Sequence, residues 1–288
     1  MLTGDPGRER YAAEPAVNNP TRMTSRRPIS LAAAGLVGLL LAGCQMTTPV
    51  GPRGSLAPSG PGASSPSTSG SPTRDAGRTA LPIGAEPLRL VTLGDSYTLG
   101  ARVRRQDTWP SQLIRALSDR VPLELAANLA QMGKSSQDVI DEQLWAVGTL
   151  QPQLVGLQVG VNDVVFPGIS LDDYRANVHH ILDELLEQLP PERIFVVTSP
   201  DYTLTAHGDD YGDPEEQRAA VEEVNRILVE AAASRGILAV DISPASDRVT
   251  DDPSLLTSDG LHPSAKQYAA WVELIAPRLH ATLLGRQP

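Results

Sequence analysis

Short apolar runs alternate with amphipathic stretches throughout residues 86–288. The runs are short enough for strands covered on both faces, and the stretches between them repeat apolar residues at helical intervals. Five strands separated by helices predict a parallel sheet between two helical layers, a three-layer α/β/α domain over residues 86–288. Strands are predicted at 88–93, 123–128, 154–158, 194–198 and 237–240, and helices at 109–119, 136–150, 171–189, 214–235 and from 265 onward.

Local signals indicate where two of these helices begin. Asp213 followed by Pro214 is typical of a capped helix start, because proline suits the first helical position. Ser264 and Gln267 have the spacing of a capping box for the last helix. Pro277 lies inside that helix, and we expect it to cause a kink.

Polar residues follow the predicted strands at the points where ligands bind in open parallel sheets. Ser96 follows the first strand, Gly133 the second, Asn162 the third, and the pair Asp259 and His262 the fifth. Each is a weak signal alone, because a serine there usually caps a helix and Asp-x-x-His is commonly a loop hydrogen bond. Their joint position at one edge of the sheet predicts a site.

The residue types in this set fit nucleophilic catalysis. A serine hydroxyl is a poor nucleophile unless a neighbouring base accepts its proton. His262 is the only one of the 5 histidines in a suitable position for that role. Asp259, three residues earlier, can turn back and hold the imidazole by its other nitrogen. Gly133 suits a close approach of backbone to substrate, since it has no side chain.

The order of Ser96, Gly133, Asn162 and His262 resembles the four-block pattern of the SGNH (GDSL) hydrolase superfamily. The resemblance covers residues 87–288 and implies a flavodoxin-like sheet and a serine carboxylic ester hydrolase. It implies a catalytic triad of Ser96, His262 and Asp259, an acyl-enzyme, and no metal or other cofactor. It also implies an oxyanion hole made by the backbone N–H groups of Ser96 and Gly133 and the Asn162 amide. Tyr97 departs from the leucine of the family name, at a position expected to pack.

The substrate class is less constrained than the reaction. The family includes lipases, thioesterases and carbohydrate esterases, so a small-molecule, lipid or carbohydrate ester is expected. The loops contain few large aromatic residues, which favours a small acyl group. An O-acyltransferase acting on envelope carbohydrate stays open, as does a non-catalytic envelope-binding lipoprotein. The net charge of −10 argues against nucleic acid as a partner. The sequence does not indicate an oligomeric state.

The first 43 residues are typical of an export signal. An apolar segment at 29–41 follows two arginines and is too short for a comfortable membrane span. It ends in a Leu-Ala-Gly-Cys sequence that resembles the lipobox of bacterial lipoprotein precursors, which implies a lipid on Cys44. Met23 is an alternative start, and a plain signal peptide or a short anchor helix are alternative interpretations. Since Cys44 is the only cysteine, an intrachain disulfide is excluded.

Residues 44–85 are rich in proline, glycine and serine and are expected to form a disordered tether. With the lipid on Cys44, the prediction is an exported protein anchored to a bacterial membrane and facing its extracytoplasmic side.

Other polar residues are assigned structural roles. Asp95 and Asp163 are expected to tie the loops of the sheet edge together. Surface, core or loop positions are expected for Trp109, His179, His180, His207, His280 and the acidic loop 209–213.

Overall fold

The computed structural model of the protein describes residues 86–166 and 168–285. The predicted leader, Cys44 and the predicted tether lie outside the described residues, so they stay predictions. Within the described ranges, no helix combines the length and apolar character needed to cross a membrane.

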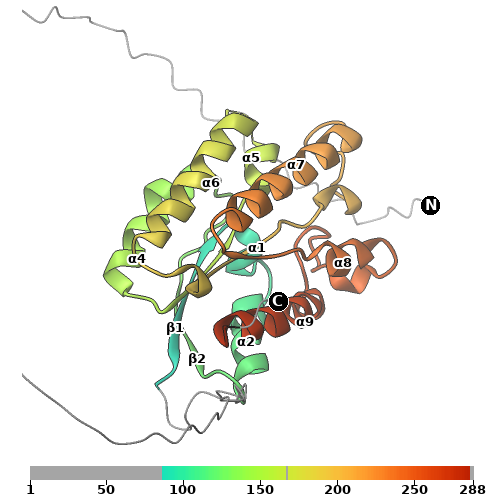
Figure 1. The fold of residues 1–288 in the computed structure, drawn as a ribbon. Helices are drawn as coiled ribbons and strands as arrows, with labels where there is room; N and C mark the ends of the chain where they lie inside the picture. The colour runs from blue at the N-terminus through green and yellow to red at the C-terminus, as the bar shows by residue number, and fades with distance from the viewer. Residues whose placement is uncertain (1–85, 167, 286–288) are drawn as a thin grey trace, which may run out of the picture. The chain divides into compact units, whose positions relative to one another are not determined.

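A five-stranded parallel sheet forms the centre of the domain, as the sequence predicts (Figure 1). The strand order is β2-β1-β3-β4-β5, which is the flavodoxin-like arrangement. The order reverses at β1, so β1 and β3 flank the position where ligands bind in such sheets. The strands are β1 (Leu88–Gly94), β2 (Leu123–Asn128), β3 (Leu154–Gln158), β4 (Ile194–Val197) and β5 (Leu238–Val240).

Helices cover both faces of the sheet, with α2 and α9 on one side and α4, α6 and α7 on the other (Figure 1). The α-helices are α1 (Ser96–Leu99), α2 (Trp109–Leu117), α3 (Ser136–Asp138), α4 (Trp145–Leu150), α5 (Val161–Val165), α6 (Leu171–Leu186), α7 (Pro214–Ala233), α8 (Ser243–Ser246) and α9 (Ala265–Leu283). The short helices are η1 (Arg105–Asp107), η2 (Val139–Leu144), η3 (Pro191–Arg193), η4 (Tyr202–Leu204), η5 (Asp247–Thr250) and η6 (Pro253–Leu255).

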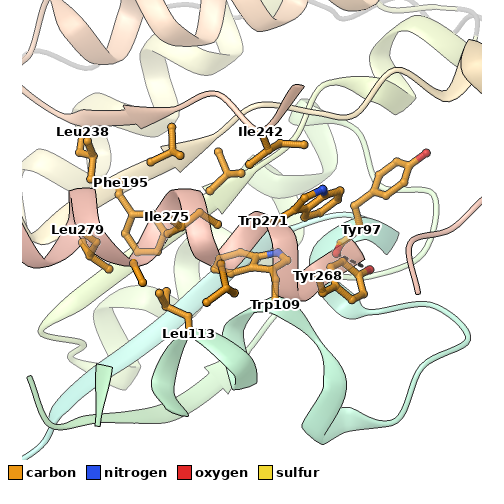
Figure 2. Packing of buried hydrophobic residues seen from close by; sticks show 14 of the residues in the cluster. Tyr97, Trp109, Leu113, Phe195, Leu238, Ile242, Tyr268, Trp271, Ile275 and Leu279 are labelled. Atoms are coloured by element: carbon orange, nitrogen blue, oxygen red, sulfur yellow. Dashed lines mark hydrogen bonds between the residues drawn. The ribbon is translucent and has the colours of Figure 1, made fainter. Parts of the chain in front are cut away.

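Two apolar cores lie on the two faces of the sheet, because successive strand residues point to opposite sides. In β1, Leu90 packs toward α2 and α9, whereas Val91 packs toward α4 and α6. Figure 2 shows the first core, where Trp109 of α2 and Trp271 of α9 lie over the sheet. Trp109 is fully buried and meets Phe195 edge to face, which confirms its predicted core position. In this core the C-terminal helix α9 packs against α2 and β5.

The segment predicted as one helix over 136–150 is three elements. It starts as α3, widens into a π-helical turn in η2 and returns to α-helix in α4. A π turn inserts an extra residue into the helical repeat and rotates the following side chains. As a result, Gln143 points into the protein and is buried.

The beginning of α9 corrects a second local prediction. Ser264 accepts a hydrogen bond from the backbone N–H of Gln267, as expected of an N-cap. The reciprocal half of the capping box is absent, because the backbone N–H of Ser264 donates to the carbonyl of Leu255, while the Gln267 side chain donates to the carbonyl of Ser246. The helix continues through Pro277 to Leu283. At the start of α7, Asp213 accepts from two backbone N–H groups, which confirms that cap.

Candidate active site

Ser96 is the first residue of α1, immediately beyond the end of β1. Asp95 caps this short helix by accepting from the backbone N–H of Tyr97. Gly94 has a φ of +141°, and a Cβ there would lie 2.0 Å from the carbonyl oxygen of Gln158. We call residues 94–97 the serine turn. Its backbone requires glycine at its first position, because β1 and β3 approach closely there.

A chain of hydrogen bonds joins Ser96, His262 and Asp259. The Oγ of Ser96 lies 3.0 Å from Nε2 of His262, and Nδ1 of His262 lies 2.8 Å from Oδ2 of Asp259. The serine and histidine are buried, with 6% and 8% of their surfaces exposed. The structure therefore brings together the three residues that the sequence selects, in the order that serine activation requires.

The other carboxylate oxygen of Asp259 is held within its own loop. Oδ1 accepts hydrogen bonds from the Thr257 hydroxyl and from the backbone N–H groups of Leu261 and His262. Burial alone would raise the pKa of Asp259, but the hydrogen bonds from His262 and Leu261 outweigh it and hold the pKa below its usual range. We call residues 257–263 the histidine loop. It presents an ionised carboxylate to the imidazole.

Three residues with N–H groups line one cavity: Ser96, Gly133 and Asn162. The N–H of Ser96 lies in the first turn of α1, where backbone N–H groups have no partner within the helix. The side-chain amide of Asn162, in α5, donates to the carbonyl oxygen of Lys134. One of its two N–H groups is thereby used to hold the segment next to Gly133.

The sequence of residues 92–270 matches the model of the GDSL-like lipase/acylhydrolase family. The chain belongs to this family. It is accordingly a carboxylic ester hydrolase, as the resemblance in the sequence implies. No curated protein matches the sequence.

Solved hydrolase structures share the fold of this chain. An acetylxylan esterase from Geobacillus stearothermophilus has 20% identity and a TM-score of 0.54, over 67% of this chain and 94% of that one. An alpha/beta hydrolase enzyme from the metagenome of Lake Arreo, Spain, has 20% identity and a TM-score of 0.52, over 69% and 95% of the two chains. At this identity the likeness establishes the SGNH hydrolase fold alone.

Two carboxyls lie buried beneath the site of this hydrolase. Asp163 accepts from the backbone N–H and the hydroxyl of Ser136, so it ties α5 to α3 as expected. Asp95 acts within the serine turn instead, and its Oδ2 has no hydrogen-bond partner among the described residues. Burial raises the pKa of Asp95 to about 7 and that of Asp163 to about 6.

Gln143 supports the serine turn and has no counterpart in the sequence predictions. Its amide accepts from the N–H of Gly94 at 2.9 Å and donates to the carbonyl oxygen of Gly94 at 2.8 Å. It therefore acts like a short strand beside the end of β1, beyond the last residue paired with β2. In the sequence, this role is indicated only by a glutamine that lies within an apolar helical pattern.

His207 lies in a loop, as expected, and 39% of its side chain is exposed. Its two ring nitrogens contact Asp210 and the backbone carbonyl oxygen of Asp259. His179 and His180 are exposed on α6, as expected.

A cavity of about 130 Å³ opens beside the hydroxyl of Ser96. Its lining includes more aromatic side chains than the sequence suggests, so the expectation of few aromatics is wrong. They are Tyr97, Phe166, Tyr202 and Tyr211. In the described part of the chain, no group of three or more His, Cys, Asp or Glu side chains is placed to hold a metal ion.

Proposed function

We propose that this hydrolase cleaves carboxylic esters through a triad of Ser96, His262 and Asp259. The observation that carries the proposal is the continuous hydrogen-bond chain from the Ser96 hydroxyl to the Asp259 carboxylate. It supports an enzyme over a non-catalytic binding module, because a retained fold alone does not require this alignment.

In the proposed reaction, the Oγ of Ser96 attacks the ester carbonyl carbon while Nε2 of His262 accepts the hydroxyl proton. The C–O bond to the alcohol then breaks, and His262 gives the proton to the leaving oxygen. Water attacks the resulting acyl-enzyme, with His262 again accepting a proton. The acid leaves and Ser96 is restored. Asp259 holds the imidazole and stabilises its charged form throughout.

Negative charge that develops on the carbonyl oxygen needs donors in place before the reaction. We assign this role to the N–H groups of Ser96 and Gly133 and to the free N–H of the Asn162 amide. Each such donor is typically worth about 3–4 kcal/mol of transition-state stabilisation. The Asn162 bond to Lys134 links two of the three donors, so they are fixed relative to each other.

The cavity supports a small acyl group as the substrate's acid portion. Its volume of about 130 Å³ is well below the range of roughly 300–1,000 Å³ usual for drug-sized ligands. Met132, Phe166 and Tyr211 are unusually exposed for apolar side chains and border the same cavity. We propose that they contact the alcohol portion of the ester. A carbohydrate is one such alcohol, since the name of a structural neighbour, an acetylxylan esterase, refers to an acetylated carbohydrate.

The test of activity is hydrolysis of p-nitrophenyl esters from acetate to palmitate by the parent and by Ser96→Ala. We expect fastest turnover of short esters and background rates for the variant. The matched control is Ser118→Ala, which changes an exposed serine at the end of α2. Retained activity in Ser96→Ala would overturn the proposal. An acyl product that appears only with an added sugar would favour the transferase alternative.

The predicted export signal and the lipobox-like sequence before Cys44 support an extracytoplasmic, lipid-anchored location. Labelled palmitate supplied to cells that express the protein should appear in the parent and not in Cys44→Ala. The parent should also fractionate with membranes. Equal labelling of the two proteins, or none in either, would overturn the anchor.

A further inference from the structure

His207 joins two loops that the chain brings together from distant positions. It lies between β4 and α7, and its Nε2 is 2.8 Å from the backbone carbonyl oxygen of Asp259. Its Nδ1 is 2.5 Å from Oδ2 of Asp210. A Cβ added at Gly260 would lie 3.8 Å from the His207 ring, so the two loops are in packing contact.

The partners of His207 determine where its protons lie. A backbone carbonyl oxygen only accepts hydrogen bonds, so Nε2 must carry a hydrogen. At 2.5 Å, Nδ1 and the Asp210 oxygen must also have a proton between them, because two lone pairs would repel. The contacts therefore fit a doubly protonated, cationic ring that donates to both loops.

The carbonyl that His207 holds belongs to the histidine loop. Hydrogen bonds within that loop fix Asp259 relative to His262, through Thr257 and the local backbone. Those bonds do not fix the loop relative to the neighbouring loops. The bond from His207 does so, since it comes from a separate segment of the sheet edge.

We propose that His207, held by Asp210, is a positioning residue that keeps Asp259 and His262 aligned with Ser96 while its ring is protonated. The inference rests on the proposed function, because it concerns the alignment of the same triad. Loss of the Nδ1 proton would place a lone pair against the Asp210 carboxylate. The ring would then turn away and release the Asp259 carbonyl.

The charged surroundings set the direction of the pH dependence. The charged groups that act on His207 are Asp210 in its own loop and Asp259 in the histidine loop, and Asp259 itself contacts His262 and Arg102. The hydrogen bond to Asp210, followed by that to the Asp259 carbonyl, raises the pKa of His207. The hydrogen bond from His207 to the Asp259 carbonyl is therefore present at low pH and is lost as pH rises through the raised pKa of His207.

The variants His207→Ala and Asp210→Asn separate this role from a purely structural one. Below the raised pKa of His207, His207→Ala should lower kcat about fivefold with little change in KM, as expected for one lost positioning hydrogen bond, and above it the variant should match the parent. Asp210→Asn should keep the parent's kcat at neutral pH, because its amide can donate to the neutral ring while Nε2 still holds Asp259. It should remove the alkaline fall in kcat that we expect of the parent.

The experiment measures kcat and KM from pH 5 to 9.5 on a short p-nitrophenyl ester, with His180→Ala as control. His180 is an exposed histidine on α6, and its replacement should leave the profile unchanged. A titration of the histidine ring protons by NMR should give His207 a midpoint above that of a free histidine, lowered in Asp210→Asn. Unchanged kcat in His207→Ala, identical profiles in the parent and Asp210→Asn, or a His207 midpoint that is not raised would overturn the inference. An active Ser96→Ala would instead overturn the proposed function itself.

Discussion

The serine turn and the histidine loop meet at one hydrogen bond, yet they are held in different ways. The serine turn lies at the end of a buried strand, with Gln143 on one side of Gly94 and β3 on the other. The histidine loop lies nearer the surface and is held by hydrogen bonds, one of them from the partly exposed His207. The comparison teaches that buried contacts beside the sheet position the serine, whereas polar contacts nearer the surface position the histidine. Changes in the serine turn should affect folding first, and changes in the histidine loop should affect kcat first.

The largest expected effect is on the histidine side, in Asp259→Asn. The amide cannot hold the imidazole in the required tautomer, so kcat should fall by about 10⁴-fold with the melting temperature nearly unchanged. Steady-state kinetics and thermal unfolding check this. Asp252→Asn is the control, since that nearby carboxylate pairs with Lys266 and not with the histidine. A large loss of stability in Asp259→Asn would break the comparison.

The next effect is on the serine side, in Gly94→Ala. The new Cβ would meet the Gln158 carbonyl at 2.0 Å on a backbone that strongly favours glycine. We expect a loss of at least about 3 kcal/mol in the free energy of unfolding. Gly168→Ala is a matched control, because its φ is also positive and nothing lies near its Cβ position. If denaturant unfolding gave equal losses in both variants, backbone strain and not the approach of β3 would explain the requirement.

Gln143→Leu sharpens the comparison, because it removes only the two hydrogen bonds by which Gln143 holds Gly94 in the serine turn. The N–H and carbonyl of Gly94 would lose two buried hydrogen bonds, which should cost about 2 kcal/mol. Residual activity should decline as the serine turn loosens, with unfolding at a lower denaturant concentration. The exposed Gln137→Leu serves as a control on the same segment. A stable Gln143→Leu would show that the remaining contacts of Gly94, with β3 and with the backbone N–H of Gln131, are enough to hold it.

The smallest effect is a change in the pH dependence of stability in Asp95→Asn. Burial raises the pKa of Asp95 from 3.8 to about 7, so the folded protein retains its proton more tightly than the unfolded chain. The parent should therefore lose stability as pH rises from about 4 to 7. The variant should lose less stability over that interval, because asparagine still caps α1 but does not titrate. Melting temperatures at pH 5 and 8 test this, and parallel shifts in both proteins would contradict it.

The sequence predicts what depends on local pattern, and it misses what depends on side chains that cross between elements. The strands and the positions of Ser96 and His262 follow from periodicity and from the topology of parallel sheets. The role of Gln143 does not, because a π turn has no distinctive sequence and the partner is a backbone group on another element. The same holds for His207, whose partner is the carbonyl of a residue 52 positions away.

The capping box before α9 illustrates competition between local and distant partners. The spacing of Ser264 and Gln267 correctly indicates the helix start. The glutamine amide nevertheless bonds to Ser246, which the fold brings within reach. A spacing rule describes only the local option, so it cannot predict which partner a long side chain will use.

The pairing of Ser96 with His262 spans 166 positions in the chain. Closing so long a loop is entropically costly, and contacts of this kind form late when a chain folds. Helical segments, whose contacts are local, can form before the hydroxyl meets its base. Regain of ester hydrolysis during refolding should therefore lag behind regain of helical content. Until His262 reaches Ser96, the folding chain has every residue of the site but does not hydrolyse esters.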